Sequence, residues 1–359
     1  MIEKLVKKTI KNFISYDANQ IPYRVKLDAN ESPFGLPGKV KSKLAEYFLE
    51  SCDLNLYPDT DSVELRKTLA AYWKTDFKNI VVGTGSDQLI DILIKIFVDK
   101  GERVMCPAPS FSMYKLNTLI VGGIPVEFEL DKNDCYSYDA DRIIEMANEY
   151  KPKIIFLCTP NNPTGGIIPE KDILKIVDAC KESVVVIDEA YAEFSRETFI
   201  PFVAGRENVI VLRTFSKAYG LAGIRCGYSI SGKEIADELN KVRPPYNISS
   251  LSLLVARLVF EERDLIDRQI DYIIKQREEL VLRLENIRGI KVYKSKSNFL
   301  LIEVPDADHL SKELTKRGVL IRSFGNVSIL KNCLRVTVGN IEQNEVLLKE
   351  IKENLINIL

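Results

Sequence analysis

The chain has 359 residues, 46% of them apolar and 28% charged, and its net charge of −1 supplies no field that would attract nucleic acid. A single histidine and seven scattered cysteines without a C-x-x-C pair exclude the usual metal sites and predict free thiols in a cytoplasmic protein. No apolar run is long enough to span a membrane, and the first residues lack the apolar core of a signal peptide.

Residues 1–38 are punctuated by prolines and glycines and predict an N-terminal arm. Beyond them, apolar runs alternate with helical patterns, which indicates an α/β fold with a doubly wound, mostly parallel seven-stranded sheet. These runs lie near residues 80, 103, 125, 154, 184, 209 and 226. Further strand signals occur at 291–293, 299–304, 319–322 and 334–338, before a last amphipathic helix. We therefore expect an arm at 1–38, a large domain at 39–250 and a small α/β domain at 251–359.

A glycine-rich turn, Gly83-Thr-Gly-Ser-Asp87, follows the first apolar strand and opens a helix. Free N–H groups at a helix N-terminus, next to a glycine bend, form a cradle for an anion. Gly85 and Ser86 are expected to face that anion, whereas Asp87 would repel it and is assigned to capping the helix. On its own, the segment indicates no more than an ordinary N-cap.

The apolar run that starts at Ser183 ends at an aspartate, Asp188. A carboxylate that closes an all-apolar strand is costly to bury without a partner. A protonated pyridinium nitrogen would supply that partner, and the aspartate would keep such a ring cationic. A helix cap is the simpler alternative, and it would be preferred if the chain had no other residues suited to a cofactor.

The segment Arg213-Thr-Phe-Ser-Lys-Ala-Tyr-Gly-Leu-Ala-Gly-Ile-Arg-Cys-Gly-Tyr228 also follows a buried strand. Thr214, Ser216, Arg225 and the backbone N–H groups around them are suited to holding a phosphate. Lys217 is not part of a P-loop, so we expect its amine to act as a nucleophile toward a carbonyl. Pyridoxal 5′-phosphate carries an aldehyde and a phosphate in one molecule, and it is the cofactor that this combination predicts. A lysine without such companions would more often be a solvated surface residue.

The spacing of Lys217, Arg225 and Gly227 resembles the cofactor-lysine signature of fold-type I pyridoxal-phosphate enzymes. The amino-acid sequence of residues 212–227 is similar to that of histidinol-phosphate aminotransferases, in the class II subfamily of these enzymes. The resemblance covers nearly the whole chain. It implies a fold-type I pyridoxal-phosphate-dependent transferase and a homodimer whose subunits share their active sites.

The resemblance also assigns cofactor roles outside this segment. Phe111 is implied to lie flat on the pyridine ring, where stacking needs only a π face. Asn162, in the string Asn-Pro-Thr-Gly, and Tyr191 are implied to hydrogen-bond to the ring oxygen O3′. Tyr57 is implied to reach the cofactor phosphate of the neighbouring subunit, although alone it would indicate only a Tyr-Pro turn.

Substrate-binding roles are implied by the same resemblance for Tyr16, Asn30, Tyr57, Asn162, Arg322 and Arg335. A fork-shaped cation on a strand suits bidentate binding of an oxyanion. In aminotransferases generally, the arginine that Arg335 matches holds the substrate α-carboxylate. In histidinol-phosphate aminotransferases, Arg322 and Arg335 would both bind the substrate phosphate. A surface ion pair is the simpler interpretation of either arginine alone.

The resemblance implies transfer of the amino group of L-histidinol phosphate to 2-oxoglutarate in histidine biosynthesis, with Lys217 as the base at Cα. Aromatic amino acid aminotransferases, acting on phenylalanine or tyrosine, share the same cofactor residues and remain the main alternative. A threonine-phosphate decarboxylase is less favoured because the chain lacks an initial His-Gly-Gly segment. A transcription regulator of this fold would need an extra domain, for which the 38 residues of the arm leave no room.

Overall fold

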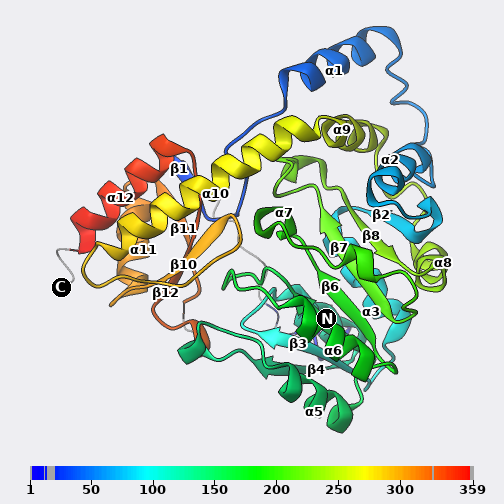
Figure 1. Ribbon diagram of the computed structural model, residues 1–359, viewed down its shortest axis with the longest axis horizontal. Coiled ribbons are helices and arrows are strands. Elements are labelled where there is room, and N and C mark those ends of the chain that lie inside the picture. Colours follow the sequence, from blue (N-terminus) through cyan, green and yellow to red (C-terminus); the bar gives the residue numbers. More distant parts are fainter. Residues whose placement is uncertain (1, 12, 14–20, 326, 356–359) are drawn as a thin grey trace.

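The structure of the protein, a computed structural model, describes residues 2–11, 13, 21–325 and 327–355. Among these residues, helices surround two β-sheets, a larger one built from residues 80–231 and a smaller one formed mainly by the C-terminal part of the chain (Figure 1). The long helix α10 (Arg263–Glu285) runs from the side of the larger sheet to the smaller sheet (Figure 1).

The strands of the described residues are β1 (Val25–Leu27), β2 (Ile80–Gly83), β3 (Arg103–Ala108), β4 (Ile124–Glu129), β5 (Ile154–Cys158), β6 (Val184–Asp188), β7 (Val209–Thr214), β8 (Gly227–Ser231), β9 (Lys291–Val292), β10 (Phe299–Glu303), β11 (Val319–Ser323) and β12 (Cys333–Thr337). The other α-helices are α1 (Gly38–Glu50), α2 (Val63–Trp73), α3 (Gly85–Phe97), α4 (Met113–Val121), α5 (Ala140–Tyr150), α6 (Glu170–Ala179), α7 (Ala192–Ser195), α8 (Lys233–Val242), α9 (Ser250–Glu261), α11 (Ala307–Lys316) and α12 (Ile341–Leu355). Within the described ranges, no helix has the length and apolar composition needed to cross a membrane.

The larger sheet has the strand order β2-β8-β7-β6-β5-β3-β4, and its pairings are parallel except for the two that β8 makes. β5 and β7 are buried along their whole length, as expected for strands covered by helices on both faces. This arrangement confirms the doubly wound, mostly parallel sheet predicted from the sequence. It also aligns the carboxyl ends of β5, β6 and β7, since Asp188 pairs with Cys158 on one side and Leu212 on the other.

The smaller sheet has the strand order β1-β11-β12-β10-β9 and includes a strand from the N-terminal arm. β1 pairs in parallel with β11, with Val25 beside Val319 and Leu27 beside Ile321. The small sheet therefore fixes the position from which the segment after β1 starts.

The domain boundaries at residues 38 and 250 remain predictions. Helix α9, which begins at the second boundary, packs against α1 and α2.

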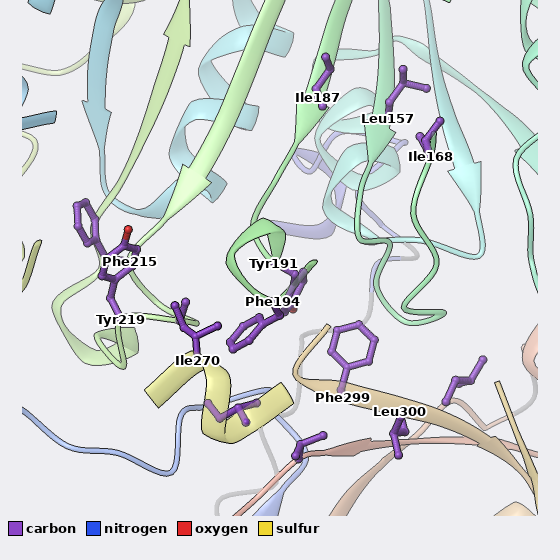
Figure 2. Packing of buried hydrophobic residues seen from close by; sticks show 14 of the residues in the cluster. Leu157, Ile168, Ile187, Tyr191, Phe194, Phe215, Tyr219, Ile270, Phe299 and Leu300 are labelled. Atoms are coloured by element: carbon purple, nitrogen blue, oxygen red, sulfur yellow. The ribbon is translucent and has the colours of Figure 1, made fainter. Parts of the chain in front are cut away.

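One apolar cluster joins the two sheets. Leu157 and Ile187 belong to the larger sheet and Phe299 to the smaller one, while Phe194 of α7 and Ile270 of α10 lie at the junction (Figure 2). Phe194 is 1% exposed and Phe299 is fully buried. Because close-packed interiors resist deformation, this cluster fixes the orientation of the small sheet relative to the large one.

Arg213 of β7 is a cation buried inside the larger sheet region. Carboxylate oxygens of Glu189 and Glu193 lie 3.3 and 3.7 Å from its guanidinium nitrogens, and its guanidinium carbon lies 4.9 Å from the ring centre of Trp73. Burial alone would lower the pKa of Arg213, but the charges of Glu193 and Glu189 raise it. Burial also raises the pKa of Glu189 in spite of its cationic neighbour, so Glu189 depends on Arg213 to remain buried in charged form.

We expect Arg213→Met to destabilise the fold by about 3–5 kcal/mol, because two carboxylates then stay buried without their cation. The loss should shrink as the pH falls, since Glu189, whose pKa is raised by burial, loses its charge on taking up a proton. Denaturant unfolding at pH 5 and pH 8 measures both effects. Arg196, whose carboxylate partners Asp267 and Asp271 are exposed, provides the control, and Arg196→Met should cost at most about 1 kcal/mol. Equal losses in the two variants would contradict this account of Arg213.

Candidate active site

A cavity of about 220 Å³ opens at the carboxyl ends of β5, β6 and β7, beside the start of α3. Ligands of parallel α/β sheets bind at this edge. The cavity wall contains most of the residues singled out from the sequence: Asn30, Ser86, Asp87, Phe111, Asn162, Asp188, Tyr191, Thr214, Ser216, Lys217, Arg225 and Arg335. They come from segments far apart in the chain, so the fold is what brings them together.

Lys217 follows the end of β7 and lies in the cavity wall. Its Nζ donates a hydrogen bond of 2.9 Å to the carbonyl oxygen of Ala29, in the segment after β1. Burial, assisted by the positive charge of Arg335, lowers the pKa of Lys217 to about 8. An amine with such a pKa is partly uncharged near neutral pH, and the uncharged form is the nucleophile.

Asp188 ends β6 in the cavity wall and is 3% exposed. Its Oδ2 accepts a hydrogen bond of 2.6 Å from the hydroxyl of Tyr114, and its Oδ1 accepts one of 3.1 Å from the N–H of Ala190. Burial raises the pKa of Asp188 to about 6, although both hydrogen bonds act in the opposite direction. A cationic group that entered the cavity would therefore be stabilised here, and a protonated ring nitrogen has the required charge.

Tyr114 is a site residue that the sequence analysis missed. It lies in the first turn of α4, three residues after Phe111, and the two rings meet edge to face with centroids 5.7 Å apart. The ring of Tyr114 is 1% exposed and stacks on Phe156 of β5 at 4.3 Å. Its spacing from Phe111 was the available signal, but the acid that its hydroxyl would reach depends on the tertiary fold.

The turn at the start of α3 and the loop after β7 form one anion cradle. Gly85 has a φ of +75°, which favours glycine. At Gly227 in β8, an added Cβ would lie 2.6 Å from the backbone nitrogen of Ser86, so only glycine lets this strand approach the turn so closely. Arg225 Nη1 donates to Ser216 Oγ at 3.3 Å. Backbone N–H groups, hydroxyls and a guanidinium thus surround a space suited to a phosphate.

Asp87 does not have the capping role expected from the sequence. The N–H of Thr84 donates instead to Oε1 of Gln88 at 2.9 Å, and Gln88 is held in turn by Asn247 Nδ2 at 2.7 Å. Asp87 Oδ2 accepts from Arg225 Nη2 at 2.7 Å. A carboxylate gains more from a charge-assisted hydrogen bond to a guanidinium than from a neutral N–H, which explains the difference.

Tyr191 and Asn162, both expected to meet a ring oxygen, lie in the cavity wall with partners from other segments. Tyr191 Oη accepts a hydrogen bond of 2.9 Å from Asn30 Nδ2, and Asn162 Oδ1 accepts one of 2.6 Å from Arg335 Nη1. Burial raises the pKa of Tyr191 to about 12. The phenol therefore keeps its proton at physiological pH and has a hydrogen to donate.

A second cavity, of about 430 Å³, adjoins the first and shares Phe111, Asn162 and Arg335 with it. Arg322 also lies in its wall, and Arg322 and Arg335 are register partners on β11 and β12. Side chains at paired positions of antiparallel strands are neighbours on the same face. Two adjacent guanidinium groups suit an anion with more than one negative charge.

Three expected residues are not among those that line these cavities, and one of them, Gly85, forms the turn directly before Ser86. Tyr57 is 81% exposed, and its ring stacks on that of Tyr246 with centroids 4.4 Å apart. The structure thus presents Tyr57 on the outside of the chain. Tyr16 lies outside the described residues.

The residues present fit pyridoxal 5′-phosphate. Lys217 offers an amine for its aldehyde, Asp188 a buried acid for its ring nitrogen, and the turn at Ser86 a cradle for its phosphate. Phe111 offers a π face for the ring. The described residues include no group of histidine, cysteine, aspartate and glutamate side chains that could hold a metal ion.

The pKa of Asp188 makes the stability of the cofactor-free protein depend on pH. Because the pKa rises from 3.8 in the unfolded chain to about 6 in the folded one, stability is lost as the pH increases through this range, by roughly 3 kcal/mol. We expect Asp188→Asn to be more stable than the unsubstituted protein at pH 8 but not at pH 4, and added pyridoxal phosphate should reverse the order at pH 8. Thermal unfolding measures this, with Asp53→Asn on an exposed loop as the control; pH profiles that run parallel would contradict it.

Comparison with known proteins identifies the family of the chain. Residues 23–351 match the family model described as aminotransferase class I and II. Over 351 residues the chain is 51% identical to histidinol-phosphate aminotransferase of Ruminiclostridium cellulolyticum and 40% identical to that of Pyrococcus furiosus, with 98% of each sequence covered. The crystal structure of histidinol-phosphate aminotransferase from Sinorhizobium meliloti in complex with pyridoxal-5′-phosphate shares the fold, with a TM-score of 0.90 over 99% of this chain and 98% of that one at 23% identity. The chain therefore belongs to the class I and II aminotransferase family.

Proposed function

We propose that the chain is a cytoplasmic, homodimeric L-histidinol-phosphate aminotransferase that uses pyridoxal 5′-phosphate and passes the amino group to 2-oxoglutarate. The observation that carries the proposal is the adjacent pair Arg322 and Arg335 beside the cavity that contains Lys217. The named relatives, which match over nearly their full length, support the same activity. All seven cysteines are free, which suits the reducing conditions of the cytoplasm.

Each of the cavity residues has a separate role in the transfer of an amino group. When bound, the cofactor supplies an electron sink for the charge that develops at the substrate Cα. Lys217 Nζ, whose pKa of about 8 leaves part of it uncharged, takes the proton from Cα. Asp188, held by Tyr114 and the N–H of Ala190, would keep a proton on the ring nitrogen. The phenol of Tyr191 would donate a hydrogen bond to the ring oxygen.

The pair of arginines favours a phosphate substrate over an aromatic amino acid. A phosphate monoester carries up to two negative charges and three oxygens, so that two guanidinium groups bind it through several charge-assisted hydrogen bonds. An amino acid such as phenylalanine presents one carboxylate, which Arg335 alone would satisfy. The position of Arg322 beside Arg335 is then explained by histidinol phosphate and not by the aromatic alternative.

Spectral titration of the cofactor-loaded protein without keto acid tests the substrate. Histidinol phosphate should convert the absorbance of the lysine-bound cofactor to that of the pyridoxamine form at a far lower concentration than phenylalanine does. Arg322→Leu should raise the histidinol phosphate concentration for half-conversion by about 10- to 100-fold, since a hydrogen bond to a charged group contributes about 1.5–3 kcal/mol. Phenylalanine should be affected little by this substitution.

A control variant and three other outcomes of the titration distinguish the proposed activity from its alternatives. Lys217→Ala is the control, and it should lose both the absorbance and the conversion. Conversion by phenylalanine at the lower concentration would indicate an aromatic aminotransferase in which Arg335 binds a carboxylate. Release of carbon dioxide from threonine phosphate would indicate the decarboxylase, and a protein that takes up no cofactor would contradict the proposal as a whole.

The homodimer with shared active sites is part of the proposal. The loop before α2 exposes Leu54, Leu56 and Tyr57 by 53%, 62% and 81%. Apolar side chains gathered on one exposed loop are typical of a protein–protein interface. Stacking on Tyr246 holds the ring of Tyr57 in a defined place on this surface, from which it would reach the cofactor phosphate of the second subunit.

Subunit mixing tests the shared site. Tyr57→Ala and Lys217→Ala are each expected to lower activity strongly as pure homodimers. In a hybrid dimer, one site would combine an intact Lys217 with an intact Tyr57 from the other subunit. Equal mixing with exchange of subunits should therefore restore about a quarter of the full activity. If no activity returns although hybrid dimers form, each site is built from one subunit.

A further inference from the structure

Asn30 lies where the arm, the small sheet and the cavity meet, and all its polar groups have partners. Its N–H donates to Thr337 Oγ1 at 3.0 Å, and its carbonyl oxygen accepts from Asn298 Nδ2 at 3.1 Å. Its side-chain Oδ1 accepts from Thr337 Oγ1 at 3.4 Å, while Nδ2 donates to Tyr191 Oη at 2.9 Å. Asn30 is 1% exposed and Thr337 is 2% exposed. These contacts hold the amide in one orientation, away from water.

The backbone of Asn30 is also constrained. Its φ of +55° lies in the left-handed region, which asparagine tolerates better than most residues but glycine adopts freely. The neighbouring Asp28 is fixed as well, because its carbonyl oxygen accepts a hydrogen bond from Arg335 Nη2. The structure around Asn30 therefore maintains a conformation that the chain would not choose alone.

Only one assignment of donors and acceptors is consistent with the hydrogen bonds around Asn30. Thr337 Oγ1 accepts from the N–H of Asn30, so the hydroxyl uses its own hydrogen to donate to Oδ1 of the same residue. With Oδ1 in that contact, the amide must turn Nδ2 toward Tyr191. Tyr191 Oη accepts this hydrogen bond, and its own hydrogen is left for another acceptor.

The cavity is where that acceptor has to be. Tyr191 lines the cavity, and the hydrogen bonds of the described residues include no protein group that accepts from its hydroxyl. The edge-to-face contact with Phe299, at 5.1 Å between centroids, holds the ring of Tyr191 in place at the junction of the two sheets (Figure 2). A ligand oxygen beside Tyr191 would take the hydrogen.

We propose that Asn30 is a positioning residue which, oriented by Thr337, makes the phenol of Tyr191 a hydrogen-bond donor into the cavity. The inference rests on the proposed cofactor and assigns Asn30 a role other than the substrate contact expected from the sequence. In this arrangement Thr337 of the small sheet would influence the cofactor indirectly, through Asn30 and Tyr191.

A donor at the ring oxygen has a measurable effect on the covalent link to Lys217. Tyr191 would stabilise negative charge on that oxygen, so that less charge would be available to hold a proton on the nitrogen of Lys217. If the hydroxyl of Tyr191 were no longer directed, the pKa of this linked nitrogen would rise. The pH dependence of the cofactor absorbance reports this pKa in the absence of substrate.

Asn30→Gly removes the amide while keeping a residue that accepts a positive φ. The pH midpoint of the absorbance of the lysine-bound cofactor should rise by about half a unit to one unit, the effect of weakening one hydrogen bond. In a Tyr191→Phe background the same substitution should leave the midpoint unchanged, because Asn30 acts only through the phenol. Thr337→Val should shift the midpoint in the same direction, and Thr337→Ser, which keeps the hydroxyl, should not.

Equal shifts in the two backgrounds would overturn the inference, since Asn30 would then act on the cofactor without Tyr191. Midpoints that do not move in either background would overturn it too. If Asn30→Gly takes up no cofactor, the comparison of Thr337→Val with Thr337→Ser decides the question. These results leave the proposed function intact, whereas an unsubstituted protein that binds no cofactor would overturn both.

Discussion

Keeping an amine and a carboxylate out of water at the same edge of a sheet is the constraint on which this site depends. Burial lowers the pKa of Lys217 and raises that of Asp188, so each group is moved toward its uncharged form. The free energy that this costs is supplied by the packing of β5, β6 and β7, whose apolar side chains are buried on both faces. The sheet thus brings the pKa values of both groups closer to neutral pH than they would be in water.

Polar contacts between distant segments then set the orientation of the reactive groups. Tyr114 reaches Asp188 from α4, and Arg335 reaches Asn162 from the small sheet. Each contact joins elements that the apolar core has already placed close together, so a single hydrogen bond is enough to choose one rotamer. The larger sheet determines where the reactive groups lie, and contacts from both α4 and the smaller sheet set the orientation of their side chains.

Local patterns were sufficient to predict the strands and the residues at their ends. Apolar runs predicted the seven strands, most of which are buried, although β4 at the edge of the sheet is largely exposed. Asp188 and Lys217 were recognisable because Asp188 ends such a run and Lys217 lies in the loop shortly after another. Contacts that depend on tertiary geometry were not accessible in this way. At the turn before α3, Gln88 and not Asp87 accepts the hydrogen bond from the N–H of Thr84, because Asp87 is paired with the distant Arg225. Asn30 likewise contacts Tyr191, which is far away in the sequence. No local sequence pattern encodes either of these distant contacts.

The contact between Asn30 and Thr337 joins residues 307 positions apart, and it has a consequence for the order of assembly. During synthesis the larger sheet and the loop of Lys217 are complete long before β12 leaves the ribosome. Until then, nothing from β12 holds the arm against the cavity, and the carbonyl of Ala29 has no fixed place beside the lysine amine. The end of the chain completes the site, so a nascent or truncated polypeptide lacks the environment that makes Lys217 reactive.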